Sequence, residues 1–175
     1  MTRQAKHKLT LLAACILGAL ALIWSYTANA EDEATFNYTA LTVDTALKAA
    51  QAALHNCRES GYQVAVAVVD RGGAVQVMLR DRYAGPHTPD TATGKAWTAV
   101  SFRTNTSDLI ELSQPGQAAN GLRYLPNVVI LGGGLKIEAA GSIIGGIGVS
   151  GAPGGEADDV CARAGIAAIE EAIEF

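Results

Sequence analysis

The stretch GSIIGGIGVSGAPGGE, residues 141–156, constrains the fold of this chain more than any other part of the sequence. Its first half mixes β-branched residues with glycines, which is typical of a buried strand that another group approaches closely. Pro153 and the two glycines after it end the strand, and acidic residues follow, as is favourable in the first turn of a helix. The sequence therefore predicts a strand, a glycine-rich turn and a last helix, and the upstream chain must supply the rest of a sheet.

The upstream segments show alternating helix and strand patterns. After Thr42, a good N-cap residue, apolar positions recur at helical spacing as far as about residue 59. Residues 62–70 and 74–80 then form a predicted hairpin, and because both faces of its first strand are apolar we expect that strand to be central. A middle helix capped by Asp90 or Thr91 follows. Further strands are predicted at 127–131 and 135–137, before the strand in the organising stretch and a helix over 155–174.

This order, α-β-β-α-β-β-β-α, predicts the fold class. Strands joined by short turns pair in antiparallel fashion. Helices grouped with such a sheet form an α+β domain, here with five predicted strands over residues 41–175.

Residues 1–30 have the pattern of a signal peptide, with a basic start, an apolar run and Ala28-Asn29-Ala30 as a cleavage site. Lipoprotein processing at Cys15 and a retained membrane anchor are the alternatives, and all three place the folded part outside the cytoplasm. Residues 31–40 are polar and predict an extended arm. Ten of the 13 basic and all 17 acidic residues follow position 30, for a net charge of −7, which argues against nucleic acid and anionic membranes as main partners.

Two cysteines, Cys57 and Cys161, lie in the predicted first and last helices. In an oxidising compartment they can form a disulfide, and otherwise they are small buried apolar residues; both alternatives stay open. The sequence has no CxxC motif and no Cys/His spacing typical of a metal site. A GxGxxG pattern begins at Gly146, but no strand follows its helix, so we reject a dinucleotide site.

Several residues are candidates for binding. His87 lies in a proline-containing loop, where an imidazole can ligate haem iron or transfer protons, although a lone loop histidine is often just solvated. His55 and Tyr83 are weaker candidates of the same kind, and Lys95 offers a cation for a propionate or carboxylate. Backbone N–H groups at the start of the last helix can bind an anion, and the residues concerned are Gly151, Gly154 and Gly155.

Three segments together resemble the GlcG/HbpS family of small haem-binding proteins and the C-terminal domain of PduO-type corrinoid adenosyltransferases. They are the hairpin AVAVVDRGGAVQVMLRD from Ala65, the helix ATGKAWTAVSFR from Ala92, and the tail that contains GGGLKI and GGIGVSGAPGGEADDVCARAG. The match covers residue 41 to the C-terminus. Two positions depart from the family pattern: Lys136 stands where proline is frequent, and His87 where many members have a small polar residue.

The resemblance implies a profilin-like fold with a five-stranded antiparallel sheet flanked by helices, assembled into homo-oligomers. It also implies haem binding in exported members, with a role in handling haem or iron. Together with the signal-peptide pattern and the loop histidine, it leads to the hypothesis of an exported, periplasmic or extracellular protein that handles, stores or senses haem or iron. In this hypothesis His87 is the iron ligand and Lys95 lies near a propionate. One alternative is an enzyme or sensor that binds a small acidic metabolite at residues 151–156, with His87 as general acid or base. Another is an accessory oligomer of an exported oxidoreductase system.

Overall fold

The computed structural model describes residues 34–174, and it divides the chain at Tyr38 into two units. The predicted signal peptide lies outside the described residues. Of the predicted arm, residues 34–40 are exposed and form neither helix nor strand. Within residues 34–174 no helix has the length and apolar character needed to cross a membrane.

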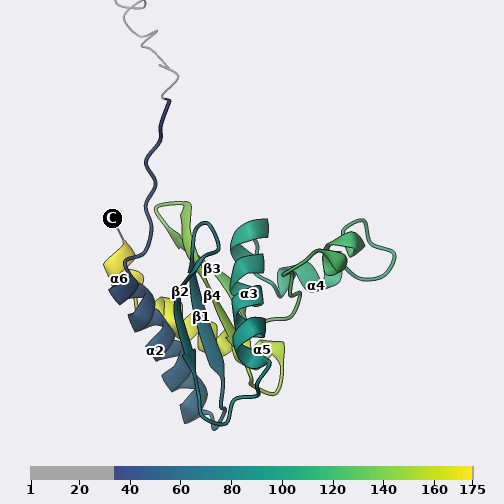
Figure 1. Cartoon of the computed structure of the whole chain (residues 1–175), viewed down its shortest axis with the longest axis horizontal. Coiled ribbons are helices and arrows are strands. Elements are labelled where there is room, and N and C mark those ends of the chain that lie inside the picture. Colours follow the sequence, from purple (N-terminus) through teal and green to yellow (C-terminus); the bar gives the residue numbers. More distant parts are fainter. Residues whose placement is uncertain (1–33, 175) are drawn as a thin grey trace, which may run out of the picture. The chain divides into compact units, whose positions relative to one another are not determined.

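An antiparallel sheet lies at the centre of the second unit (Figure 1). Its strands are β1 (Ala65–Asp70), β2 (Val75–Arg80), β3 (Gly134–Ala139) and β4 (Ser142–Ser150), in the order β2-β1-β4-β3. β1 pairs with β2 on one side and with β4 on the other, so the prediction that this strand is central is confirmed. The two glycine-rich hairpins, β1–β2 and β3–β4, thus meet along the β1–β4 pair.

The sheet of the described residues has four strands, so the fifth strand predicted at 127–131 is not confirmed. This segment lies along α3 (Thr88–Phe102) instead. The Val129 N–H donates to Thr98 Oγ1 over 2.9 Å, and the Val129 side chain packs over Gly94, which has no Cβ to obstruct it. A helix side chain therefore satisfies the backbone that a neighbouring strand would otherwise pair with, and the strand propensity of these residues is overridden.

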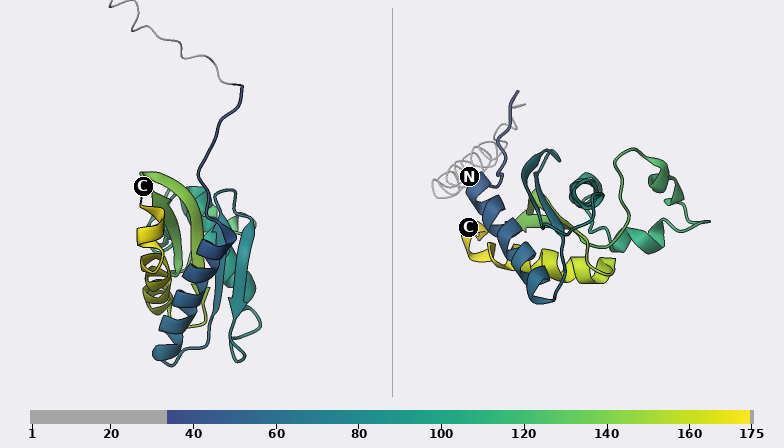
Figure 2. Two further views of the ribbon diagram at one scale, coloured as in Figure 1. Left: turned by 90° about the vertical axis from the view of Figure 1, so that its left-hand side faces the viewer. Right: turned by 60° about the horizontal axis from the view of Figure 1, so that its bottom comes forward.

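Helices cover both faces of the sheet (Figure 2). α2 (Val43–Glu59) and α5 (Gly155–Ala167) cover one face, and α3 covers the other. The last helix, predicted as one element, ends at Ala167, and the short α6 (Glu170–Ile173) follows. Residues 108–126 carry α4 (Asp108–Leu112) and the 3-10 helix η1 (Asn120–Tyr124), and they project from the body beside α3 (Figure 1).

The alternating side chains of β1 divide the core in two. Val66 and Val68 pack with α2 and α5 in the larger cluster, whereas Ala67 and its neighbour Ala65 pack against Ala92 of α3. All of them are fully buried. The small residues on the second face let α3 lie close to the sheet, and the valines on the first face fill the wider space under two helices.

The N-terminal caps of α2 and α3 differ in how well the sequence predicts them. Thr42 caps α2 as predicted, since its hydroxyl accepts from the Thr45 N–H over 3.2 Å. α3 begins at Thr88, with His87 at the N-cap position, so the prediction that Asp90 or Thr91 caps this helix is wrong. Pro89 explains the earlier start, because the first turn of a helix does not use its N–H groups and tolerates proline.

The glycines of β4 are explained by α3. A methyl group on Gly148 would lie 1.9 Å from the Ala92 carbonyl oxygen, and one on Gly146 would lie 3.0 Å from that of Ala96. The group that closely approaches this strand is therefore the backbone of α3. This contact is among the most extensive in the fold, and it holds α3 directly over the centre of the sheet.

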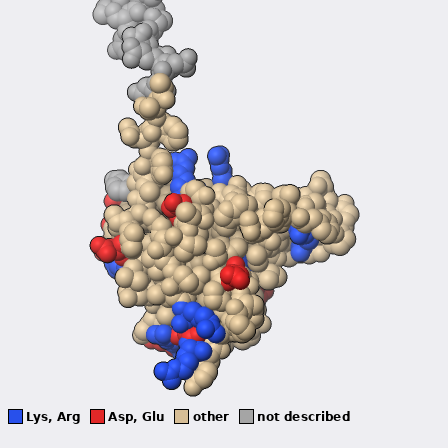
Figure 3. Space-filling model, in the orientation of Figure 1, with Lys and Arg blue, Asp and Glu red and all other residues tan. Residues whose placement is uncertain are grey.

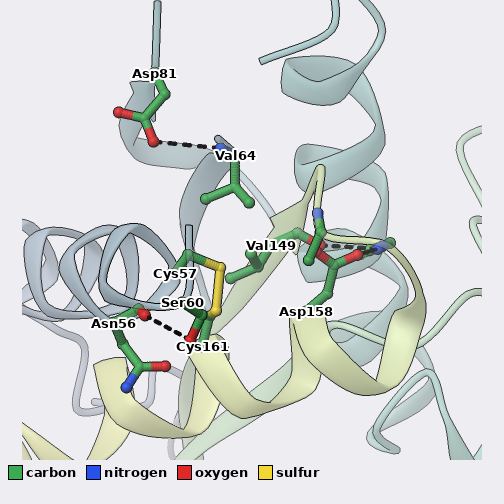
Figure 4. The surroundings of a disulfide bond; sticks show 10 residues. Asn56, Cys57, Ser60, Val64, Asp81, Val149, Asp158 and Cys161 are labelled. Carbon is green, nitrogen blue, oxygen red and sulfur yellow. Dashed lines mark hydrogen bonds and ion pairs between the residues drawn. A yellow bond between two sulfur atoms is a disulfide. The ribbon is translucent and has the colours of Figure 1, made fainter. Parts of the chain in front are cut away.

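A disulfide joins Cys57 of α2 to Cys161 of α5, with 5.4 Å between the Cα atoms (Figure 4). Both residues are buried, and they are 104 positions apart in the sequence. Of the two alternatives for these cysteines, the structure contains the bonded one. The bond links the two helices that cover the larger core.

Candidate functional site

A pocket of about 460 Å³ lies where the N-terminal ends of α3 and α5 meet, and it is called the α3–α5 pocket below. It brings together five residues that the sequence singled out from three separate segments. They are His87, Lys95, Gly151, Gly154 and Gly155. Its wall also includes Asp158 and the exposed side chain of Leu131.

His87 presents its imidazole to this pocket. Its backbone is fixed, because the His87 carbonyl accepts from both the N–H and the hydroxyl of Thr91 at 3.1 and 2.9 Å. Its ring lies over Gly85, where a Cβ atom would come within 2.8 Å of the ring carbon Cε1. Neither ring nitrogen has a hydrogen-bond partner among the described residues. The imidazole is therefore held near the pocket with its nitrogens available to a ligand.

Lys95 lies beneath the pocket and is only 2% exposed. Its Nζ donates to Asp158 Oδ2 over 2.7 Å and to the Val149 carbonyl over 2.8 Å. An ammonium group has three N–H donors, so one remains for a ligand. The positive charge of Lys95 is already balanced by Asp158, and an anionic ligand would share it with that carboxylate.

Asp158 fastens the glycine-rich turn to the rest of the fold. Its second oxygen accepts from the Ala152 N–H over 3.0 Å, so one carboxylate joins α3, the turn and the first turn of α5 (Figure 4). Burial raises the pKa of Asp158, and the hydrogen bonds from Lys95 and Ala152 oppose that effect only in part. The pair is a buried ion pair with additional hydrogen bonds on both sides.

The turn itself offers backbone donors. The N–H groups of Gly154 and Gly155 have no hydrogen-bond acceptor within residues 34–174, and they stand at the start of a 13-residue helix. Gly155 packs directly on Gly132, where a Cβ would lie 2.7 Å from the Gly132 backbone. Asp159 Oδ1 accepts from the Gly133 N–H over 2.6 Å and holds this second glycine loop in place. The arrangement can bind a carboxylate or another anion.

Two predicted candidates lie outside the pocket. His55 is on the exposed side of α2, with its Nδ1 3.5 Å from Glu59 Oε2, and the sheet separates α2 from α3. Tyr83 is 77% exposed and does not line the pocket. Haem ligation by any of these residues stays a prediction. The sequence analysis did not identify Asp158 as the partner of Lys95. A signal was available, because Lys95 lies among alanines that are typical of a buried helix face, and a buried lysine requires a carboxylate partner.

Comparison with known proteins places the chain in a family. The family model described as haem degrading protein HbpS-like matches residues 41–167, so the chain belongs to the HbpS-like family. The resemblance to this family is thereby confirmed. The matched segment contains the sheet, the α3–α5 pocket and both cysteines of the disulfide.

Two solved structures and one sequence relative are similar to this chain. A double mutant of HbpS from Streptomyces reticuli is 42% identical, with a TM-score of 0.72 over 80% of this chain and 94% of that one. A structure described as a PduOC:haem complex is 35% identical, with a TM-score of 0.71 over 75% and 96%. The corrinoid adenosyltransferase PduO of Salmonella typhimurium is 36% identical over 121 residues, which are 68% of this chain and only 36% of PduO.

Proposed function

We propose that this chain binds haem in the α3–α5 pocket, with His87 as an axial ligand of the iron. The observation that carries the proposal is an imidazole with no hydrogen-bond partner among the described residues, on the wall of a pocket, in a family with a relative that is described as a haem complex. Histidine is a common axial ligand of haem iron, and the pocket lies within the size range of small-molecule sites.

The residues of the pocket fit the other parts of haem. The exposed side chain of Leu131 offers an apolar contact for the macrocycle. The N–H groups of Gly154 and Gly155, and the third N–H of Lys95, suit carboxylate groups such as the propionates. Bound haem would supply an iron centre whose reactivity the axial ligand sets. His87 would orient it, and the glycine-rich turn would hold its polar edge.

The His87→Ala variant is expected to bind haemin more than about tenfold more weakly, since losing even an outer partner of a metal ligand costs about 10- to 100-fold. The measurement is a haemin titration followed by the Soret band, in which the unaltered protein should saturate near one haem per subunit or per dimer. His55→Ala is the matched control, because it removes an exposed imidazole outside the pocket. Equal affinity and an unchanged spectrum in His87→Ala would remove this residue from the role.

A second candidate function uses the same turn. The N–H groups of Gly154 and Gly155, which have no acceptor among the described residues, favour a small carboxylic acid, with His87 as general acid or base beside it. The same titration separates the two functions. A flat haemin response, combined with stabilisation by one acid in a thermal-shift screen of small carboxylates, would favour an enzyme or sensor.

We also propose that the protein is exported and acts in an oxidising compartment. The signal-peptide pattern of residues 1–30 and the disulfide between Cys57 and Cys161 support this. The protein recovered from the periplasm or medium is expected to begin at Glu31. Mass spectrometry of its N-terminal peptide checks this, and an N-terminal Cys15 carrying lipid would indicate lipoprotein processing instead.

Assembly into homo-oligomers is part of the proposal. Large apolar side chains are exposed on the projecting segment of residues 108–126, and exposed apolar surface of this kind can serve as an interaction surface. The residues concerned are Leu112, Tyr124 and Leu125.

A further inference from the structure

A second pocket, of about 430 Å³, lies at the opposite end of α3 from His87. It is called the arginine pocket below. Three segments meet there: the β1–β2 turn with Arg71, the C-terminal end of α3 with Ser101 and Arg103, and the β3–β4 hairpin with Ser142. Since α3 has 15 residues and is about 22 Å long, His87 and Arg103 stand about that far apart at its two ends. On the face drawn in Figure 3, Lys and Arg side chains stand at the upper edge, where Figure 1 places these turns.

The charges around this pocket add up to a positive site in an acidic protein. Arg71 and Arg103 line it together with one carboxylate, Glu138, whose Oε2 accepts from Lys136 Nζ over 2.8 Å. Glu138 is thus already neutralised by a neighbour that does not line the pocket. The C-terminal end of α3 contributes only about half of a negative charge, which is less than the full positive charge of Arg103 alone. The pocket therefore favours an anion.

Several donors in the pocket have no partner in the described part of the chain. The guanidinium of Arg103 and the hydroxyls of Ser101 and Ser142 make no hydrogen bond or ion pair with any residue of 34–174. Arg71 also lines the pocket, but it already takes part in another interaction, so it is not counted among these donors. Three polar side chains from two segments are thus available to a ligand at one place. Val100 and Ile143 add an apolar part to the lining.

Left-handed backbone conformations occur at Arg103 and just before Ser142. Arg103 is left-handed, with φ 53°, and its N–H donates to the Ala99 carbonyl at the end of α3. Ala140, with φ 47°, and Gly141, with φ 76°, form the tight turn that presents Ser142. Of the three non-glycine residues with positive φ in residues 34–174, two therefore lie in or beside this pocket. Such conformations cost free energy and are frequent at binding sites.

We propose that the arginine pocket binds a small organic anion, such as a phosphate monoester or a dicarboxylate. A guanidinium group matches carboxylate and phosphate oxygens in paired hydrogen bonds, and that of Arg103 has no partner within residues 34–174. The serine hydroxyls would complete the oxygen contacts, and Val100 and Ile143 would contact a short carbon chain. This site is separate from the α3–α5 pocket and does not depend on haem.

Isothermal titration with phenyl phosphate, inorganic phosphate and succinate, at constant ionic strength, tests the proposal. The unaltered protein should bind one of the two organic dianions saturably. Arg103→Gln should weaken that binding by at least about tenfold, as expected for loss of a charge-assisted contact. Arg103→Lys keeps the positive charge but lacks the paired N–H groups of a guanidinium. Its affinity should lie between that of the unaltered protein and that of Arg103→Gln. Arg163→Gln is the matched control, because this exposed arginine of α5 lies outside the pocket.

The His87→Ala variant should bind the dianion as the unaltered protein does, and Arg103→Gln should leave the haemin titration unchanged. Failure of this proposal is thereby separate from failure of the proposed haem site. Absence of saturable binding of all three probes would overturn the proposal. So would equal weakening by Arg103→Gln and Arg163→Gln, which would indicate attraction to net charge alone. Circular dichroism of each variant verifies that the fold is intact.

Discussion

Replacing Lys95 by methionine should lower the free energy of unfolding by about 3–5 kcal/mol at neutral pH. The methionine fills a similar volume, but it leaves the Asp158 carboxylate buried without its cation, since Lys95 and Asp158 are 2% and 3% exposed. Chemical denaturation of the variant and the unaltered protein measures the difference. Lys48→Met, which changes an exposed lysine of α2, should cost less than about 0.5 kcal/mol.

The pH dependence of this loss follows from Asp158. Burial already raises its pKa above the unfolded value, and removing Lys95 takes away the main opposing interaction. A carboxyl whose pKa is raised on folding contributes stability below its unfolded pKa, near 3.9, and loses that contribution as the pH rises through the folded pKa. The cost of Lys95→Met should therefore be largest at neutral and alkaline pH and should shrink towards acid pH.

The double variant Lys95→Met/Asp158→Asn separates charge from packing. Asparagine retains an oxygen that can accept the Ala152 N–H, and it carries no charge to bury. It should recover most of the stability lost in Lys95→Met at neutral pH, and the pH dependence of the loss should disappear. A cost of Lys95→Met below about 1 kcal/mol, or one that is equal at all pH values, would contradict a buried ion pair.

This ion pair also shows what the sequence could not predict. Lys95 and Asp158 are 63 positions apart, and no local pattern pairs them. By contrast, the sequence does predict that β1 is central, because a strand buried on both faces has an apolar composition throughout. The segment 127–131 has the composition of a strand, but Thr98 supplies its backbone partner, which only the packed structure shows.

The candidate site was predictable in its parts and not in its arrangement. His87, Lys95 and the glycines of residues 151–155 were each selected for their chemistry, and the structure brings them to one pocket. His55 was selected for the same chemistry as His87, yet α2 places it on the other side of the sheet. Residue type indicates what a side chain can do, whereas the packing of α3 and α5 decides which residues do it together.

Removing the Cys57–Cys161 bond should lower the free energy of unfolding by about 2–5 kcal/mol. The bond closes a loop between residues 104 positions apart, so it excludes many extended conformations of the unfolded chain. It is also the covalent link between α2 and α5, whose mutual packing forms much of the larger core. Urea denaturation with and without reductant measures the effect.

The variant Cys57→Ala/Cys161→Ala is the matched control, since its stability should be low under both conditions and insensitive to reductant. Peptide mapping after thiol blocking should find both cysteines unmodified and linked in the unaltered protein. If both are alkylated without reduction, or if reductant leaves the urea midpoint unchanged, the bond does not stabilise the fold. A fold that depends on this bond is less stable in a reducing cytosol, where the two cysteines stay reduced. The contribution of the bond to the stability of the α2–α5 core therefore supports the proposed export.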